Sequence, residues 1–326
     1  MSEEFPQPQV DIPIPKLPIK RFIISFLGIL AVGFVGAVFL SNVSKNTSEP
    51  SQQTIQENTV TPEELGYTLR ADFEEGVFPD AWKGSYEIVN LERALAVSPD
   101  AEKGTYAAKF TVASGDLIKG KSRAELAWDN HNAEGVEELY LWNVKIPENY
   151  QDVPLIAKDG RPNWQVIGQW HDQPDVTKGE TWDSYPAHSS SLALNYGFLT
   201  QNDPEYKRII ASGIGDSIVG FSPDYDNQPM ISVTYGTPPQ PIALYPIQKG
   251  VWNTVTAHVL WSQTEKGFAE VSINGMSVTG GKHFGVNKYN AASAYFKFGL
   301  YRHEDIPYTN SIFYDNVRIE RVKQNQ

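Results

Sequence analysis

Short runs of alternating apolar and polar residues, separated by turn-forming residues, most constrain the fold of this chain. The segment 163–171 is an example, because in a β-strand successive side chains point to opposite faces. One face would carry Trp164, Val166, Gly168 and Trp170, and the other Gln165, Ile167, Gln169 and His171. The first face suits packing on a second sheet, and the second ends in an amide and an imidazole.

Similar segments recur along the chain, whereas helical periodicity is scarce. Strands are predicted at Tyr67–Phe73, Tyr106–Val112, Ser122–Trp128, Leu139–Ile146, Trp164–His171, Ser191–Tyr196, Met230–Tyr235, Thr254–Trp261, Ala269–Ile273, Ser277–Val278, Ala294–Tyr301 and Ser311–Arg321. The pair Asn274-Gly275 between two of them is typical of a type I′ hairpin turn. The pattern predicts one all-β domain, residues 67–326, folded as a sandwich or jelly roll of two antiparallel sheets.

Composition excludes several classes of site and partner. The chain contains no cysteine, which rules out disulfides, a thiolate nucleophile and cysteine-ligated metal. Its formal net charge is −12, so nonspecific nucleic-acid binding is not expected.

The N-terminal residues have the pattern of a membrane anchor. Residues 22–40 form a run of 19 residues without a charge, close to the roughly 20 needed to cross a bilayer. Lys16, Lys20 and Arg21 precede this run, and the positive-inside rule therefore places the proline-rich tail 1–21 in the cytoplasm. The polar segment 41–66 is a predicted flexible stem. The chain is thus predicted to span the membrane once, with its folded domain in the periplasm or outside the cell. If residues 22–40 are instead a signal peptide cleaved near Ala37, the domain is secreted.

Three of the predicted strands carry acid–base or charged groups on the face opposite their apolar residues. The pairs are Arg123 with Glu125, Gln169 with His171, and Lys297 with Tyr301. Each pair alone has a structural explanation, such as a surface ion pair or a solvated charge. Together they indicate a site, provided that the three strands are neighbours in one sheet.

These strands also carry a family resemblance. Arg-x-Glu at 123–125, Gln-x-His at 169–171 and Tyr-x-Lys-x-Gly-x-Tyr at 295–301 occur in this order. They resemble the signature strands of jelly-roll polysaccharide lyases of the alginate lyase type, and more closely those of the heparin lyase I-like and glucuronan lyase-like group. The resemblance extends from about residue 70 to 322. It implies a concanavalin-like jelly roll that acts as a monomer. It also implies that the chain cleaves an anionic polysaccharide by β-elimination at a uronic acid and that the reaction requires no cofactor. No conspicuous basic cluster is present, so a heavily sulfated substrate such as heparin is not expected.

The resemblance also implies roles for individual residues. Gln169, Arg123 and Lys297 would neutralise the uronate carboxylate and stabilise the enolate-like intermediate. Either His171 or Tyr301 would remove the C5 proton, and the sequence leaves this choice open. Residues expected to contact the substrate or orient these groups are Glu125, Arg302, Tyr295 and His188.

Acidic residues lie near the first and last strands, either as ligands of a structural metal ion or because adjacent strands bring acids together without one. Glu74 and Asp315 resemble the calcium ligands of many jelly rolls, and oxygen ligands suit calcium. The sequence therefore predicts at most a structural calcium ion there.

Two other functions fit the same fold. A lectin-like jelly roll would hold a glycan without cleaving it, but would need no acid–base pair. A glycoside hydrolase would need two carboxylates across the cleft, and no strand carries such a motif.

Overall fold

The computed structural model describes residues 65–76, 86–88, 95–118, 120–153, 163–185, 189–199, 219 and 228–322. All of them belong to one compact unit, Asn58–Gln326. The predicted tail and anchor, with most of the stem, lie outside these ranges. Within the described ranges no helix has the length and apolar character to cross a bilayer.

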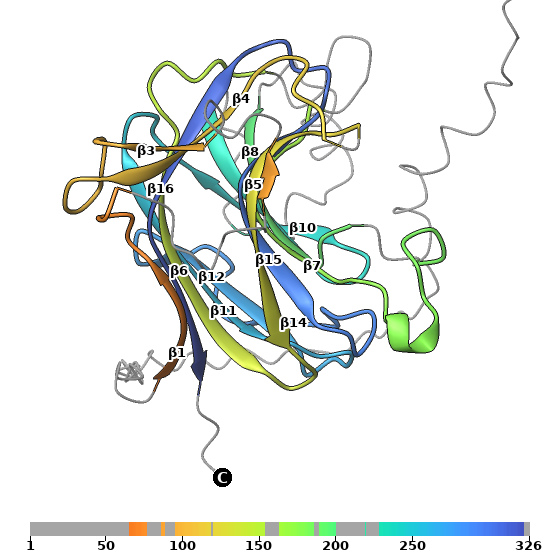
Figure 1. The fold of residues 1–326 in the computed structure, drawn as a ribbon. Coiled ribbons are helices and arrows are strands. Elements are labelled where there is room, and N and C mark those ends of the chain that lie inside the picture. The colour runs from red at the N-terminus through yellow and green to blue at the C-terminus, as the bar shows by residue number, and fades with distance from the viewer. Residues whose placement is uncertain are drawn as a thin grey trace, which may run out of the picture. The chain divides into compact units, whose positions relative to one another are not determined.

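The described residues form two antiparallel sheets, as predicted (Figure 1). The first sheet has the strand order β13 (Met276–Ser277), β12 (Phe268–Ile273), β11 (Trp252–Leu260), β6 (Glu137–Lys145), β16 (Asn310–Val322), β4 (Ala107–Val112) and β3 (Leu95–Ser98), with β1 (Leu65–Ala71) paired to β16 and β14 (His283–Phe284) to β12. The second has the order β10 (Gln240–Pro246), β9 (Gln228–Tyr235), β8 (Leu192–Leu199), β7 (Gln165–His171), β15 (Ala294–Arg302), β5 (Ser122–Asn132) and β2 (Tyr86–Ile88). A short 3₁₀ helix, η3 (Val176–Lys178), follows β7.

The sheets pack face to face around an aromatic core. Trp142 of the first sheet lies with its ring centroid 5.8 Å from that of Trp170 of the second. Farther along, Phe110 and Tyr314 of the first sheet both contact Phe298 of the second, edge to face. Each strand therefore buries its apolar face between the sheets, which confirms the predicted sandwich.

All twelve predicted strands are present, and the Asn274-Gly275 turn is confirmed. Asn274 and Gly275 have φ angles of 53° and 77°, and Ile273 pairs with Met276 across them. A type I′ turn requires this pair of positive φ angles. The first strand begins earlier than predicted, because β1 starts at Leu65, which pairs with Val322, inside the predicted stem.

The predicted division of faces in β7 is wrong at one end of the strand. The register with β15 shifts around Ile167, since Gly168 pairs with Phe298 whereas Val166 pairs with Tyr301. A bulge of this kind turns the following side chains to the other face. Ile167 is consequently buried in the core, and Val166 shares a face with Tyr301.

Candidate active site

The three strands that carry the sequence motifs are neighbours, and β15 lies between β7 and β5. Lys297 of β15 pairs with Gln169 of β7, and Tyr301 pairs with Arg123 of β5. Directly opposed residues of antiparallel strands point to the same face. The core occupies the opposite face, where Trp170 and Phe296 are fully buried. The motif side chains thus share the face that is turned away from the core.

Glu125 holds two of the motif side chains together. Its Oε1 accepts a hydrogen bond of 2.6 Å from Gln169 Nε2, and its Oε2 lies 3.7 Å from Arg123 Nη1. Ser190 Oγ donates to Gln169 Oε1 over 2.6 Å, which fixes the orientation of the amide. Gln169 and Glu125 are 3% and 1% exposed. The amide and the guanidinium are therefore held on the two oxygens of one buried carboxylate.

Gly299 makes this arrangement possible, because it lies on β15 between Lys297 and Tyr301 and opposite Glu125. The Gln169 amide reaches Glu125 across β15 at this point, and the β15 backbone lies close against β5 there. Gly299 also has a φ of 135°, and a Cβ there would lie 2.3 Å from the Ala124 carbonyl oxygen. This position accepts only glycine without local rearrangement.

Tyr314, from the opposite sheet, is hydrogen-bonded to the backbone at the bulge between β7 and β15. The hydroxyl oxygen of Tyr314 lies 2.8 Å from the carbonyl oxygen of Gly299 and 2.5 Å from that of Ile167, and donates its proton to this pair. Burial raises the pKa of Tyr314 well above its ordinary value, so it remains a neutral donor. Tyr314 thereby ties β15 to β7 at the bulge.

Tyr301 lies between a cation and an aromatic ring. The guanidinium carbon of Arg123 is 4.1 Å from the Tyr301 ring centroid. The ring of Trp164 packs edge to face at 4.6 Å. A cation over the ring attracts its π-electrons and would favour negative charge that develops on the phenol oxygen.

His171 belongs to a second cluster farther along the same face. Its ring stacks on Tyr295 at 5.6 Å, and its Nδ1 is 2.5 Å from the carbonyl oxygen of Asp172. Lys297 Nζ lies 5.0 Å from the Tyr295 ring centroid. The exposed ring of Trp182 meets His171 edge to face at 5.7 Å. The face thus offers a partly open row of aromatic and charged groups along β15.

Arg302 differs from the sequence prediction. It follows Tyr301 on β15 and therefore points to the opposite face, where it is fully buried. Its Nη2 donates to the carbonyl oxygens of Val112 and Tyr308, and burial lowers its pKa. Arg302 is a structural residue that joins Val112, at the end of β4, to Tyr308, in the loop after β15. It does not line the motif face. His188 lies outside the described residues.

The two acids predicted to bind calcium both accept backbone hydrogen bonds. Glu74 accepts from the amides of Thr105 and Tyr106, and Asp315 from those of Glu102 and Lys103. Burial raises the pKa of Asp315, and the nearby Glu74 charge adds to this effect. Among the described residues, no group of three or more His, Asp or Glu side chains could hold a metal ion. A calcium ion at this place stays a prediction.

Ser190 and Trp182 contact the motif residues but were not predicted from the sequence. Ser190 precedes β8, which flanks β7, and only the pairing of those strands brings it to Gln169. Trp182 lies in the turn-rich segment after η3 and is 48% exposed. A tryptophan among Gly, Glu, Thr and Asp residues is the signal that could have identified it.

Comparison with known proteins gives the family and similar folds. The sequence model of a family described as "Polysaccharide lyase" matches residues 73–318. An endo-β-1,4-glucuronan lyase from the fungus Trichoderma reesei has a similar fold, with a TM-score of 0.50 and 17% identity over 80% of this chain and 100% of that one. The alginate lyase Aly36B gives a TM-score of 0.49 and 13% identity over 79% and 98% of the two chains. The catalytic domain of a glycoside hydrolase family 131 protein from Coprinopsis cinerea gives 0.46 and 13% over 78% and 93%. No curated protein matches the sequence.

Proposed function

Because the chain belongs to the polysaccharide lyase family, we propose that it cleaves a uronic-acid-containing polysaccharide by β-elimination on the face formed by β5, β7 and β15. The observation that carries this proposal is the chain of contacts from Gln169 through Glu125 to Arg123 and Tyr301. It joins carboxylate-neutralising donors to an acid–base group on the sheet face turned away from the core.

The first requirement of the reaction is neutralisation of the uronate carboxylate. The C5 proton becomes acidic only when the negative charge beside it is balanced, because its removal creates an enolate-like dianion. Arg123 and Lys297 together outnumber the single charge of Glu125, so the cluster keeps a net positive charge. The Gln169 amide gives one proton to Glu125 and has a second that can bind the substrate carboxylate.

The second requirement is a base next to those donors. Tyr301 and His171 are the two candidates, and they are not equivalent in position. Tyr301 is in contact with Arg123, whereas His171 pairs with Tyr295, six residues along β15 and about 20 Å away in an extended strand. C5 and its carboxylate carbon are bonded to each other, so the base must lie close to the cation that binds the carboxylate. Of the two proposed cations, Arg123 contacts Tyr301 directly, whereas Lys297 and His171 each contact the ring of Tyr295. This favours Tyr301 as the acid–base group and His171 as a contact to another sugar of the bound chain.

The elimination needs no co-reactant, because the same tyrosine accepts one proton and returns it. The Tyr301 phenolate takes the C5 proton, and the C5–H electrons form the C4–C5 double bond. The C4–O glycosidic bond breaks, and the departing oxygen receives a proton from the phenol. The products are one chain with a new reducing end and a second chain with an unsaturated uronyl residue at its non-reducing end.

The proposal is tested by incubating the purified chain with alginate, polyglucuronate, hyaluronan, chondroitin and heparin separately. An increase in ultraviolet absorbance from the unsaturated uronyl end on at least one polymer supports elimination. New reducing ends without this absorbance would show hydrolysis, and binding without cleavage would show a lectin-like protein. Either result contradicts the proposal.

The membrane anchoring and cellular location of the enzyme depend on residues outside the described ranges and stay predictions. We propose that residues 22–40 anchor the chain and that the lyase domain acts as a monomer outside the cytoplasm. Fractionation of membranes, followed by protease treatment of intact cells, would test the anchor and its orientation.

A further inference from the structure

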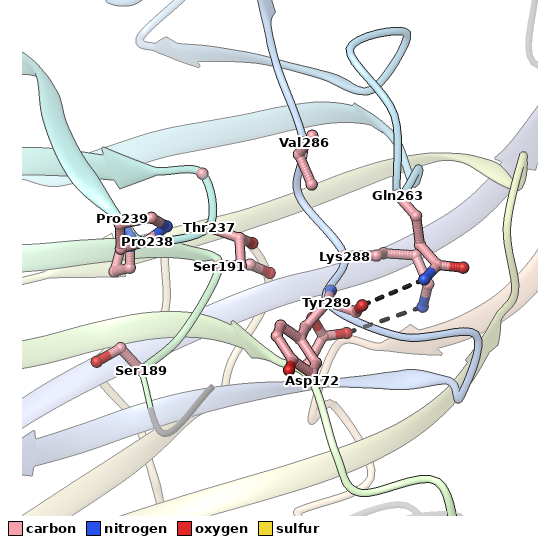
Figure 2. A pocket seen from close by; sticks show the side chains of 11 residues that line it. Asp172, Ser189, Ser191, Thr237, Pro238, Pro239, Gln263, Val286, Lys288 and Tyr289 are labelled. Carbon is pink, nitrogen blue, oxygen red and sulfur yellow. Dashed lines mark hydrogen bonds and ion pairs between the residues drawn. The ribbon is translucent and has the colours of Figure 1, made fainter. Parts of the chain in front are cut away.

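A cavity of about 450 Å³ opens where the chain leaves β7 (Figure 2). Its walls come from Asp172, from the segment before β8, from the turn Gly236–Pro239 and from the loop 286–289. The cavity adjoins the proposed active site. Asp172 follows His171 directly and its carbonyl oxygen contacts the imidazole, while the wall residues Ser189 and Ser191 flank Ser190, the partner of Gln169.

Three polar atoms in these walls are buried without a hydrogen-bond partner among the described residues. They are Asp172 Oδ1, Ser191 Oγ and Thr237 Oγ1. Asp172 and Ser191 are 1% and 3% exposed. Buried polar groups are nearly always satisfied in folded proteins, and three exceptions around one cavity point to a polar occupant. The cavity is also much larger than the space that a single water molecule needs.

The charges in the cavity are balanced. Lys288 Nζ lies 3.9 Å from Asp172 Oδ1, and both side chains are buried. Lys288 Nζ also donates to the Ala292 carbonyl oxygen, and the Tyr289 amide donates to Asp172 Oδ2 (Figure 2 shows the Asp172–Lys288 pair). Burial moves the pKa of Asp172 up and that of Lys288 down, towards the neutral forms. A carboxylate or sulfate that entered would find no net positive charge to compensate its desolvation.

Hydroxyl groups fit these walls. Asp172 Oδ1 accepts hydrogen bonds, and the hydroxyls of Ser191 and Thr237 both donate and accept. Pro238 and Val286 supply apolar wall, and the ring of Tyr289 is 42% exposed at the edge. A few convergent polar groups beside apolar and aromatic surface are typical of a small-ligand pocket, and a pyranose ring has the complementary surface.

We propose that this cavity is a subsite for an uncharged sugar residue of the substrate, bound through its hydroxyl groups. The proposal rests on the proposed function, because it places this sugar beyond His171 on the chain whose uronate is cleaved at Tyr301. It assigns the substrate to mixed polysaccharides that contain both neutral and uronic residues, rather than to pure polyuronates.

Binding is measured on the full chain with Tyr301→Phe, in which cleavage is expected to be strongly reduced. The probes are methyl glycosides of neutral hexoses and, for comparison, methyl glucuronoside, followed by saturation-transfer NMR and calorimetry. At least one neutral glycoside is expected to bind more tightly than the glucuronoside. Ser191→Ala and Thr237→Val are each expected to weaken that binding roughly two- to tenfold, the value of one hydrogen bond. The matched control Thr256→Val lies on β11 of the other sheet and is expected to have no effect.

Asp172→Asn, which removes the acceptor charge but retains the shape, is expected to weaken the binding further. The thermal unfolding of Asp172→Asn is compared with that of the parent chain. If this variant does not fold, Ser191→Ala and Thr237→Val decide the result. Binding of no neutral glycoside, binding that both hydroxyl variants leave unchanged, or preference for the glucuronoside would each overturn the subsite. None of these results depends on elimination, whereas absence of any unsaturated product from the parent chain would overturn the proposed function alone.

Discussion

The side-chain amide of Gln169 donates a 2.6 Å hydrogen bond to the carboxylate of Glu125 across the whole width of strand β15. The two residues lie on strands that do not pair with each other, because β15 lies between them, with Lys297 opposite Gln169 and Gly299 opposite Glu125. This contact gives Glu125 a larger role than the orientation of Arg123 alone. It holds Gln169 and Arg123, two of the three proposed carboxylate-binding groups, in place.

Replacement of Glu125 by glutamine is expected to lower kcat/KM roughly 10- to 100-fold. The change removes the charge that accepts the Gln169 hydrogen bond, a contact worth about 1.5–3 kcal/mol, and the ion pair with Arg123, while it keeps the volume of the side chain. Steady-state rates of unsaturated-product formation measure the effect. Glu137→Gln on β6 of the other sheet is the matched control, and equal activities of the two variants would contradict the role of Glu125.

Tyr301→Phe is expected to lower kcat roughly 10²- to 10⁴-fold, the usual contribution of a general acid–base group. Tyr295→Phe on the same strand loses an equivalent hydroxyl and should retain most of the activity. His171→Ala should affect KM more than kcat. Loss of kcat in the histidine variant with activity preserved in Tyr301→Phe would reverse the assignment.

Trp182→Ala is expected to raise KM roughly two- to tenfold with little change in kcat. An exposed aromatic ring beside His171 offers a stacking surface worth about 0.5–1.5 kcal/mol. Phe284→Ala, on β14 of the other sheet, removes an aromatic ring that is also exposed and serves as the control. A kcat effect without a KM effect would argue against sugar stacking.

Gly299→Ala is expected to destabilise the domain by about 1–3 kcal/mol, because alanine disfavours its positive φ and the new Cβ would collide with the neighbouring strand. Gly168→Ala on the adjacent strand is milder, since its Cβ would meet only the Trp142 ring, at 3.4 Å. Urea unfolding of both variants measures the difference. Equal free energies of unfolding would show that the β15 backbone adapts.

Glu138 is expected to make the stability depend on pH. Burial raises its pKa above the ordinary 4.5, so its contribution to folding is fully present below pH 4.5 and is lost as the pH rises through the folded value. The glutamine amide of the Glu138→Gln variant does not titrate over this pH range. The free energy of unfolding of the parent chain should therefore fall relative to the variant over this range, and a constant difference would contradict the prediction.

The strands could be predicted from alternation, but their irregularities could not. Strand β10 was missed because Pro241 and Pro246 argue against a strand, although an edge strand such as β10 tolerates proline. The very short β2 and β3 have too few residues to show a period. The bulge at Ile167 was missed because it depends on the register with two neighbouring strands.

The motif residues could be predicted, whereas their grouping required the structure. Alternation placed Gln169, Lys297 and Tyr301 correctly on the face opposite the core. Arg302 was assigned to the substrate from the family resemblance, but it directly follows Tyr301, and adjacent residues of a strand point to opposite faces. The cavity at Asp172 joins segments more than a hundred residues apart, and no local pattern indicates such a meeting.

The positions of β15 and β16 have a consequence for the order in which the domain folds. They are the last two strands of the part of the chain that the structure describes, yet β15 inserts between β5 and β7 and β16 between β4 and β6, so each fills an interior position of one sheet. Neither sheet is continuous until residues 294–322 have left the ribosome, and such distant pairings form slowly. A partly synthesised chain therefore has no Tyr301 and an open gap in both layers. The proposed active site can therefore form only after β15 has paired with β5 and β7.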